Sequence, residues 1–234
     1  MNKLRIGLLA LSTDPTIERD FRKILPEEVE YFVSRVPYAN SDTPENYRMM
    51  ANELTKATAL ILPGICLDVL AYGCTSATVE IGAETIFKLL RAAKPEAKCT
   101  TPLTAAISGF EKLKVRRISL LTPYGDEINQ SMKQYLQSYN ISVIKVASFY
   151  LNTDEEKASV TPEAIGEAAC QIDGKEVEGI FISCTALRGA EEIASIESQL
   201  GKPVITSNQA LIWEALRLGG YNKSIPGYGC LMQA

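Results

Sequence analysis

Short apolar runs alternate along the chain with longer stretches in which apolar and polar residues recur at helical spacing. The apolar runs predict strands at 4–11, 29–36, 58–63, 68–72, 117–122, 142–148, 178–183 and 203–206. The amphipathic stretches predict helices at 15–25, 43–56, 79–93, 103–113, 125–139, 162–173, 189–200 and 208–218. This alternation is typical of βαβ units around a mainly parallel sheet, so the predicted fold class is α/β.

The order of these elements repeats along the chain. Three pairs of segments match in the same order: RIGLLALSTD (5–14) with RISLLTPYGD (117–126), AYGCTSA (71–77) with FISCTAL (181–187), and KCTTPLTAAI (98–107) with KPVITSNQAL (202–211). The ordered matches predict two pseudo-symmetric, Rossmann-like (flavodoxin-like) halves, 1–112 and 113–234, with a C-terminal helix that can cross over to the first half. Because ligands of such folds bind at the carboxyl ends of parallel strands, the site is expected in the cleft between the halves.

Composition and charge narrow the class of protein. The net charge is −4 over 234 residues, and the densest basic segment is KLKVRR (112–117), which is typical of a solvated turn before a strand. No uncharged apolar run reaches the roughly 18 residues that would span a bilayer. The apolar stretch near the N-terminus is shorter than a signal-peptide core. We therefore expect a cytoplasmic globular protein that binds neither nucleic acid nor membrane.

The residue types present restrict the chemistry further. The chain contains no histidine, which excludes Ser-His-Asp hydrolysis, Cys-His proteolysis and histidine-based metal sites. Its 6 cysteines form no C-x-x-C pair, so zinc-ribbon and thioredoxin motifs are absent from the sequence. In a reducing compartment they are expected to be free thiols. Acid–base chemistry is then left to Cys, Asp, Glu, Lys or Tyr.

Two cysteines, Cys74 and Cys184, occupy matching points of the repeat, each directly after a predicted strand and each followed by Thr. A helix that starts there would lower the thiol pKa and favour the thiolate, which acts as a nucleophile or base. The backbone amides at such turns bind carboxylates. Hydroxyl groups at these and equivalent turns add further donors: Ser12, Thr13, Thr75, Ser76, Thr122, Tyr124 and Thr185. The pattern predicts a pocket for a small mono- or dicarboxylate, in which neutral donors would stabilise an enediolate without a metal.

Structural roles are the alternatives for several of these residues. A single cysteine after a strand is more often a small buried side chain, and Cys66, Cys99, Cys170 and Cys230 are interpreted in that way. Asp14 and Asp126 are N-cap candidates, Tyr124 can cap or pack against a helix, and Asn208 can simply open the last helix. These alternatives remain open from spacing alone.

Several segments resemble one known family over essentially the whole chain. They are LSTDPTIERDF, DVLAYGCTSATVEIG, KVRRISLLTPYGDEIN, GIFISCTALRG and GKPVITSNQALIWEALRLGG. Together they resemble the aspartate/glutamate racemase superfamily, and within it the branch of maleate cis–trans isomerase, arylmalonate decarboxylase and an ectoine-utilisation protein. The resemblance implies two pseudo-symmetric halves, an active site between them, and no cofactor or metal.

The resemblance also implies roles for single residues. Cys74 would be the nucleophile that attacks the double bond, and Cys184 its acid/base partner. Decarboxylases of the branch keep only the second cysteine, so the presence of Cys74 favours isomerisation. The implied substrate-binding residues are Ser12, Asp14, Thr75, Ser76, Tyr124, Thr185 and Asn208. Asp14 stands where isomerases usually carry asparagine, and Asn152 or Asp154 would be the counterpart of a second asparagine.

The resulting prediction is a cofactor-independent, two-cysteine isomerase that acts on a small carboxylate in the manner of maleate isomerase. The alternatives are a two-base racemase of the aspartate/glutamate type, a decarboxylase of the arylmalonate type, and a non-enzymatic protein that binds a small carboxylate. The apolar positions in LIWEALRLGGY (211–221) fit packing on the chain's own core or on a partner subunit. We expect a homo-oligomer, either a dimer or a tetramer.

Overall fold

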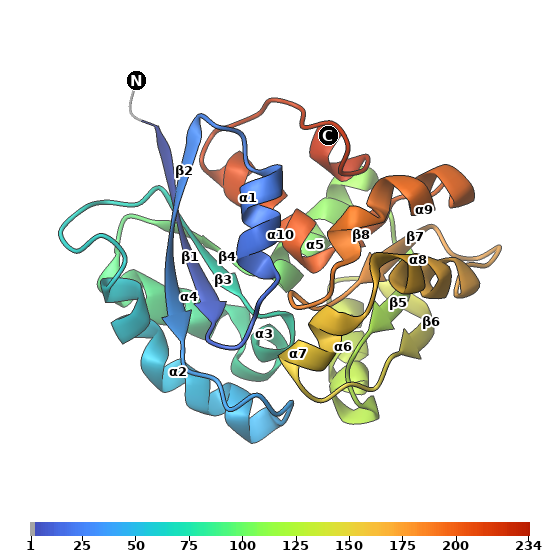
Figure 1. Cartoon of the computed structure of the whole chain (residues 1–234), viewed down its shortest axis with the longest axis horizontal. Coiled ribbons are helices and arrows are strands. Elements are labelled where there is room, and N and C mark those ends of the chain that lie inside the picture. The colour runs from blue at the N-terminus through green and yellow to red at the C-terminus, as the bar shows by residue number, and fades with distance from the viewer. Residues whose placement is uncertain (1–2) are drawn as a thin grey trace.

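A computed structural model describes residues 3–234, which form two four-stranded sheets surrounded by helices (Figure 1). The strands are β1 (Leu4–Leu11), β2 (Val29–Val36), β3 (Val69–Gly73), β4 (Lys98–Thr100), β5 (Arg117–Thr122), β6 (Ser142–Ser148), β7 (Gly179–Ile182) and β8 (Val204–Thr206). The strand orders are β2-β1-β3-β4 and β6-β5-β7-β8, and every pairing is parallel. The sequence repeat is thus a repeat of topology, which confirms the predicted α/β fold of two similar halves.

Helices follow nearly every strand. They are α1 (Ile17–Ile24), α2 (Pro44–Ala59), α3 (Thr75–Ile81), α4 (Ala83–Ala93), α5 (Pro102–Leu113), α6 (Asp126–Ser138), α7 (Asp154–Ser159), α8 (Pro162–Gln171), α9 (Ile193–Leu200) and α10 (Ser207–Leu218), with short 3-10 turns η1 (Gly189–Glu191) and η2 (Leu231–Gln233). Thr101, Thr153 and Thr206 each form a capping box, in which the side chains satisfy free backbone amides. The start of these helices is therefore fixed by local sequence.

Strand order places the two cysteines. In each sheet the chain moves from a central strand (β1 or β5) to one side and then returns to the other side at β3 or β7. The gap between the carboxyl ends of these neighbouring strands is the topological switch point, where ligands bind in open parallel sheets. Cys74 follows β3 and Cys184 follows β7, so both thiols lie at a switch point.

Helix α10 joins the two halves. It follows β8 of the second sheet, yet it packs against α5 and contacts β3 and β4 of the first sheet (Figure 1). Leu211 and Leu216 are fully buried there. Packing within the chain therefore accounts for the apolar face of this helix. The predicted boundary between residues 112 and 113 falls at the end of α5.

The predicted strand at 58–63 is wrong. Helix α2 continues to Ala59, and a turn follows in which the Leu60 side chain is 73 % exposed. Lys94 holds this turn, because its Nζ donates 2.8 Å hydrogen bonds to the carbonyls of Leu62 and Ile65. A short apolar run fits either a strand or the end of a buried helix, and periodicity alone does not separate them.

Two helices also differ from the prediction. The single helix expected at 79–93 is split at Gly82, whose φ of 86° few other residues adopt, into α3 and α4. Helix α3 begins directly after Cys74. Helix α7 was not predicted, because its six residues are too few to show an amphipathic period.

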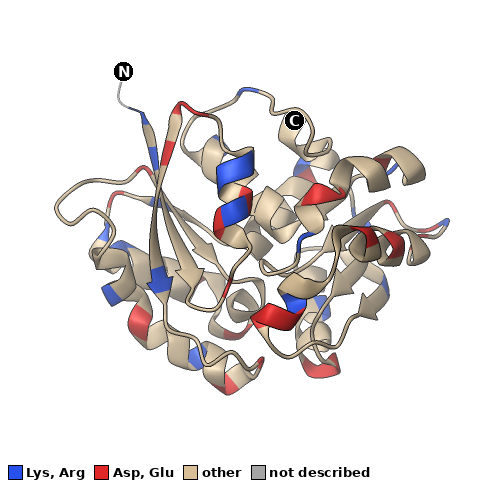
Figure 2. Cartoon of the chain, in the orientation of Figure 1, with Lys and Arg blue, Asp and Glu red and all other residues tan. Residues whose placement is uncertain are grey.

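Charged side chains are mixed along the helices. On the face in Figure 2, Lys and Arg segments alternate with Asp and Glu segments on α1 and α2. In α1 the first turn is acidic and the last turn is basic, which suits the helix dipole. Among residues 3–234, no helix has the length and apolarity needed to span a bilayer.

Candidate active site

Cys74 is the N-cap residue of α3. Its Sγ accepts a hydrogen bond from the backbone nitrogen of Ala77 at 3.4 Å, and the Ser76 hydroxyl lies 3.7 Å from the same sulfur. The Cys74 carbonyl accepts a 2.7 Å bond from the Thr78 hydroxyl, which fixes the turn. The predicted placement at a helix N-terminus is therefore observed for this thiol.

Cys184 lies in a different local structure. Cys184 follows β7, but the next residues form a bend rather than a helix, and the first helical turn is η1 at Gly189. Its φ is 128°, a region that L-residues rarely adopt and that often marks functional sites. Ser207 supports this backbone, because its hydroxyl accepts a 2.9 Å hydrogen bond from the Cys184 nitrogen. The expectation of a helix terminus behind Cys184 was wrong.

Both thiols line one small cavity between the halves. The cavity measures about 10 Å³, close to the space that one water molecule needs. It is lined by Leu11, Tyr38, Asp42, Tyr47, Cys74, Thr75, Ser76, Tyr124, Asp154, Lys157, Cys184 and Thr185. A molecule as large as a dicarboxylate requires its walls to move apart.

The predicted site residues divide into two groups. Cys74, Cys184, Thr75, Ser76, Tyr124 and Thr185 are brought together around the cavity. Ser12, Asp14 and Asn208 are not among the residues that line it. The Ser12 hydroxyl accepts a bond from the Tyr38 nitrogen, so Ser12 contacts a segment of the wall instead.

Asp14 and Asn208 lie behind the cavity wall. Asp14 Oδ1 accepts bonds from the backbone nitrogens of Thr16 and Ile17, so this carboxylate caps α1. Burial raises the Asp14 pKa, against the opposing effect of those two amides. Asn208 Nδ2 donates 2.8 Å bonds to the Thr185 carbonyl and to Asp20 Oδ2. Asn208 therefore holds the turn that carries Thr185.

Burial controls the protonation of the two thiols. It raises the pKa of Cys74 to about 12, although the Ala77 amide and the Ser76 hydroxyl act in the opposite direction. Burial also raises the pKa of Cys184 to about 12, while the Lys157 ammonium lowers it. The helix terminus was expected to produce a thiolate at Cys74, but in this closed cavity the loss of hydration outweighs it. The thiols are protonated at neutral pH in this state.

Four polar residues of the cavity wall were not found from the sequence. Tyr38, Asp42 and Tyr47 come from the β2–α2 connection and the start of α2, and Lys157 comes from α7. Asp42 Oδ1 accepts 2.6 Å bonds from the hydroxyls of both tyrosines. In the sequence these residues show no signal beyond ordinary loop and helix polarity, because they do not lie at strand ends. Asp154 was considered from the sequence only through the family resemblance, as a counterpart of the family's second asparagine.

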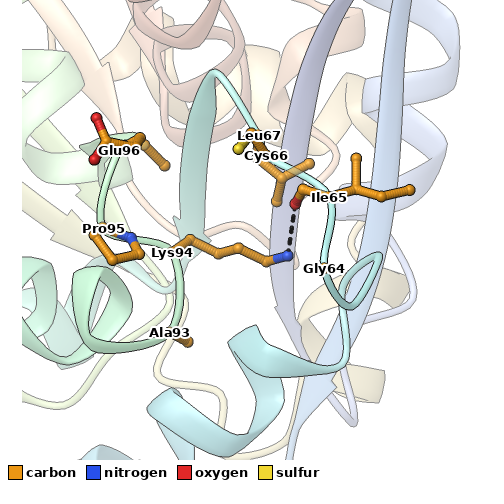
Figure 3. A pocket seen from close by; sticks show the side chains of 9 residues that line it. Gly64, Ile65, Cys66, Leu67, Ala93, Lys94, Pro95 and Glu96 are labelled. Atoms are coloured by element: carbon orange, nitrogen blue, oxygen red, sulfur yellow. Dashed lines mark hydrogen bonds between the residues drawn. The ribbon is translucent and has the colours of Figure 1, made fainter.

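A second hollow of the surface is lined by a single thiol. The pocket in Figure 3, about 180 Å³, lies at the amino ends of β3 and β4, next to Cys66. Its cation Lys94 is already bound to the carbonyls of Leu62 and Ile65. Within residues 3–234, no group of three or more Cys, Asp or Glu side chains is arranged to hold a metal ion.

Known proteins match most of the chain. The family model described as "Arylmalonate decarboxylase" matches residues 43–232. The arylmalonate decarboxylase of Bordetella bronchiseptica is 33 % identical over 136 residues, which span 57 % of each chain. The maleate isomerase of Geobacillus stearothermophilus is 23 % identical over 97 % of this chain and 96 % of its own.

Solved structures share the fold. A mutant of the Nocardia farcinica maleate cis-trans isomerase with a covalently bound succinylcysteine intermediate superimposes with a TM-score of 0.90, at 20 % identity and 98 % coverage of both chains. The maleate isomerase Iso of Pseudomonas putida S16 gives a TM-score of 0.89, at 21 % identity over 99 % of this chain and 98 % of that one.

Proposed function

The chain belongs to the arylmalonate decarboxylase family, and from this premise we propose that it is a cofactor-independent, two-cysteine isomerase of a small carboxylate. Its reaction would be like that of maleate cis–trans isomerase. The observation that carries the proposal is that Cys74 and Cys184 line one cavity among neutral hydrogen-bond donors. The likeness to maleate isomerases over nearly the whole chain supports it.

Cys74 would act as the nucleophile. Its thiol first gives its proton to water, and the resulting thiolate sulfur forms a bond to one carbon of the double bond while the C=C π bond breaks. The neighbouring carbon takes the electron pair and then a proton from Cys184. The substrate then has a single bond, about which it rotates. Cys184 removes the proton again, the double bond reforms, and the C–S bond breaks to release the trans isomer. After release of the product, Cys74 takes a proton from water again, and the two thiols end in their starting states.

Neutral donors would hold the reacting carboxylate. Thr75, Ser76, Tyr124 and Thr185 line the cavity, and their hydroxyl and backbone N–H groups suit an enediolate whose charge grows during the reaction. Thr75 is itself fixed, because its hydroxyl lies 2.9 Å from the Ser207 hydroxyl. We assign Ser12, Asp14 and Asn208 to the support of these walls, through the contacts described above.

Racemisation is the second candidate. A cavity with one thiol from each half suits removal of an α-proton by one cysteine and its return by the other. Decarboxylation of the arylmalonate type is also within the family. It is less favoured, because a second thiol at Cys74 has no role in a reaction that needs only one.

We further propose that the protein is a cytoplasmic homo-oligomer, a dimer or a tetramer. The support is an exposed apolar strip on the edge strand β6, where Ile144 and Val146 are more than one third exposed. Apolar edge strands are often covered by a partner. Light scattering of the wild type and of Val146→Lys tests this, and a wild-type monomer contradicts it.

Proton NMR in D₂O tests the proposed reaction. Maleate, both enantiomers of aspartate and glutamate, and an arylmalonate are each incubated with wild type, Cys74→Ser and Cys184→Ser. Conversion of maleate to fumarate that requires Cys74 supports isomerisation, whereas deuterium at an α-carbon indicates racemisation. Cys66→Ser is the matched control, since Cys66 is an exposed thiol outside the cavity. Failure of all these compounds, and of the maleate monoamide maleamate, to react overturns the proposal.

The covalent step has its own test. In Cys184→Ser the adduct on Cys74 would form and take its proton from water. Removal of that proton would be slow without Cys184, so the adduct should accumulate. Intact-protein mass spectrometry after incubation with maleate is expected to show a succinyl addition, and peptide mapping should place it on Cys74. An adduct on Cys66 or Cys99 instead would contradict the assigned nucleophile.

A further inference from the structure

A buried ion cluster forms one wall of the cavity. Lys157 Nζ lies 2.7 Å from Asp42 Oδ2 and 3.2 Å from Asp154 Oδ1, and all three side chains are at most 9 % exposed. Asp154 is also held by the first half, since its Oδ2 accepts from the Thr13 hydroxyl and its nitrogen donates to Asn40 Oδ1. The cluster is therefore held by contacts from both halves of the chain, and it lines the same cavity as both thiols.

The charges of this cluster do not cancel. Asp42 and Asp154 accept hydrogen bonds from hydroxyl groups and face an ammonium group, as ionised carboxylates do. The Lys157 pKa is raised, because the neighbouring Cys184, Asp42 and Asp154 outweigh the opposite effect of burial. Of the described residues that line the cavity, Lys157 is the only cation, and it already contacts both carboxylates. With the thiols protonated, the wall carries one net negative charge.

We propose that the Asp42–Lys157–Asp154 cluster selects a monoanionic carboxylate, whose far end carries an amide or ammonium group, over a dicarboxylate. The inference rests on the proposed function and narrows its substrate class. A second carboxylate would enter a water-poor cavity that has no free cation for it and two fixed carboxylates nearby. An amide or ammonium N–H can instead donate to Asp42 or Asp154, which satisfies both groups.

A purely structural role is the competing explanation, because the cluster ties α7 to the β2–α2 connection. The two roles have different consequences. Loss of a structural tie changes stability and weakens every ligand to a similar extent. Loss of a selective charge changes the ratio of the binding affinities for a dianion and a monoanion of the same shape. The ratio therefore separates the two explanations.

Succinate and succinamate are suitable probes. They match in size and differ by one charge, and neither has a double bond to which Cys74 could add. Calorimetry at about pH 8, where carboxyl groups are ionised, is expected to show that wild type binds succinamate about tenfold or more tightly than succinate. Asp154→Asn should reduce this preference to less than about threefold, because the cluster becomes neutral. Glu155→Gln is the control, since Glu155 is an exposed neighbour on α7, and it should keep the wild-type ratio.

Three results overturn the inference: equal or tighter binding of succinate by wild type, an unchanged ratio in Asp154→Asn, or no binding of either probe. The ratio of the wild-type affinities for succinamate and succinate tests the inference even where Asp154→Asn fails to fold. The proposed function is tested separately, by comparing kcat/KM for maleate and for its monoamide, maleamate. If neither is isomerised, the isomerase proposal fails, while the succinate and succinamate ratio still reports on the cluster.

Discussion

The hydroxyl of Ser207 accepts a 2.9 Å hydrogen bond from the backbone nitrogen of Cys184. The same hydroxyl lies 2.9 Å from that of Thr75, the residue after Cys74. One side chain at the start of α10 thus fixes both cysteine-bearing turns relative to each other. The geometry of the two thiols depends on this serine, although its hydroxyl forms a hydrogen bond to neither sulfur.

Replacement of Ser207 by alanine should affect stability and activity together. The buried Cys184 nitrogen would lose its acceptor, which costs about 1–3 kcal/mol of unfolding free energy. We expect kcat for the isomerisation to fall by about tenfold or more, because the two thiols lose their common support. Urea unfolding and NMR rates measure the two effects. The exposed Ser195→Ala should change stability by less than about 0.5 kcal/mol, and an equally small effect at Ser207 would contradict the role given to it.

Thiol modification should follow exposure in the absence of substrate. Cys74 and Cys184 are 4 % and 7 % exposed, and burial raises both pKa values to about 12. Cys66 is exposed and should react first with iodoacetamide at neutral pH. Peptide mapping at successive times measures the order. Modification of Cys74 before Cys66 would show that the free enzyme spends its time in a more open, more polar state.

Stability should fall at alkaline pH because of the same two thiols. The folded state binds their protons up to about pH 12, whereas an unfolded cysteine loses its proton near pH 8.5. Their contribution is therefore complete below about pH 8.5 and is lost as the pH rises toward about 12, by up to about 1.4 kcal/mol per pH unit for each thiol. Urea unfolding of wild type and Cys74→Ser between about pH 8.5 and about pH 12 measures the contribution of the Cys74 thiol to stability. Parallel curves for the two proteins would rule out a buried Cys74 proton as the cause.

Loss of the Lys157 ammonium should be costly. Lys157→Met would leave the buried carboxylates of Asp42 and Asp154 without their counter-ion, and about 3–5 kcal/mol of stability is expected to be lost. Adding Asp154→Asn should recover part of the loss, because it removes one unpaired charge. Thermal or urea unfolding of the single and double variants measures the coupling. Strictly additive effects would mean that the two residues do not form a coupled pair.

The sequence was sufficient where local patterns coincide with tertiary contacts. Central parallel strands such as β1 are buried on both faces, so they appear as continuous apolar runs, and their order predicted the duplicated fold. Cys74 and Cys184 were predictable because strand ends at matching points of a repeat meet in one cleft. The error at 58–63 has the opposite cause, since that apolar run has no strand beside it to pair with.

The amino-acid pattern was enough to predict the two α/β halves, to exclude histidine chemistry and to identify the six residues that turns bring to the cavity. Tertiary structure alone decided the protonation of the thiols and the ion cluster beside them. A pKa depends on hydration and on charges from distant segments, and a helix terminus seen in the sequence does not report either. Asp42 and Lys157 are more than 100 residues apart, and only the closed packing of the β2–α2 connection on α7 brings them into contact.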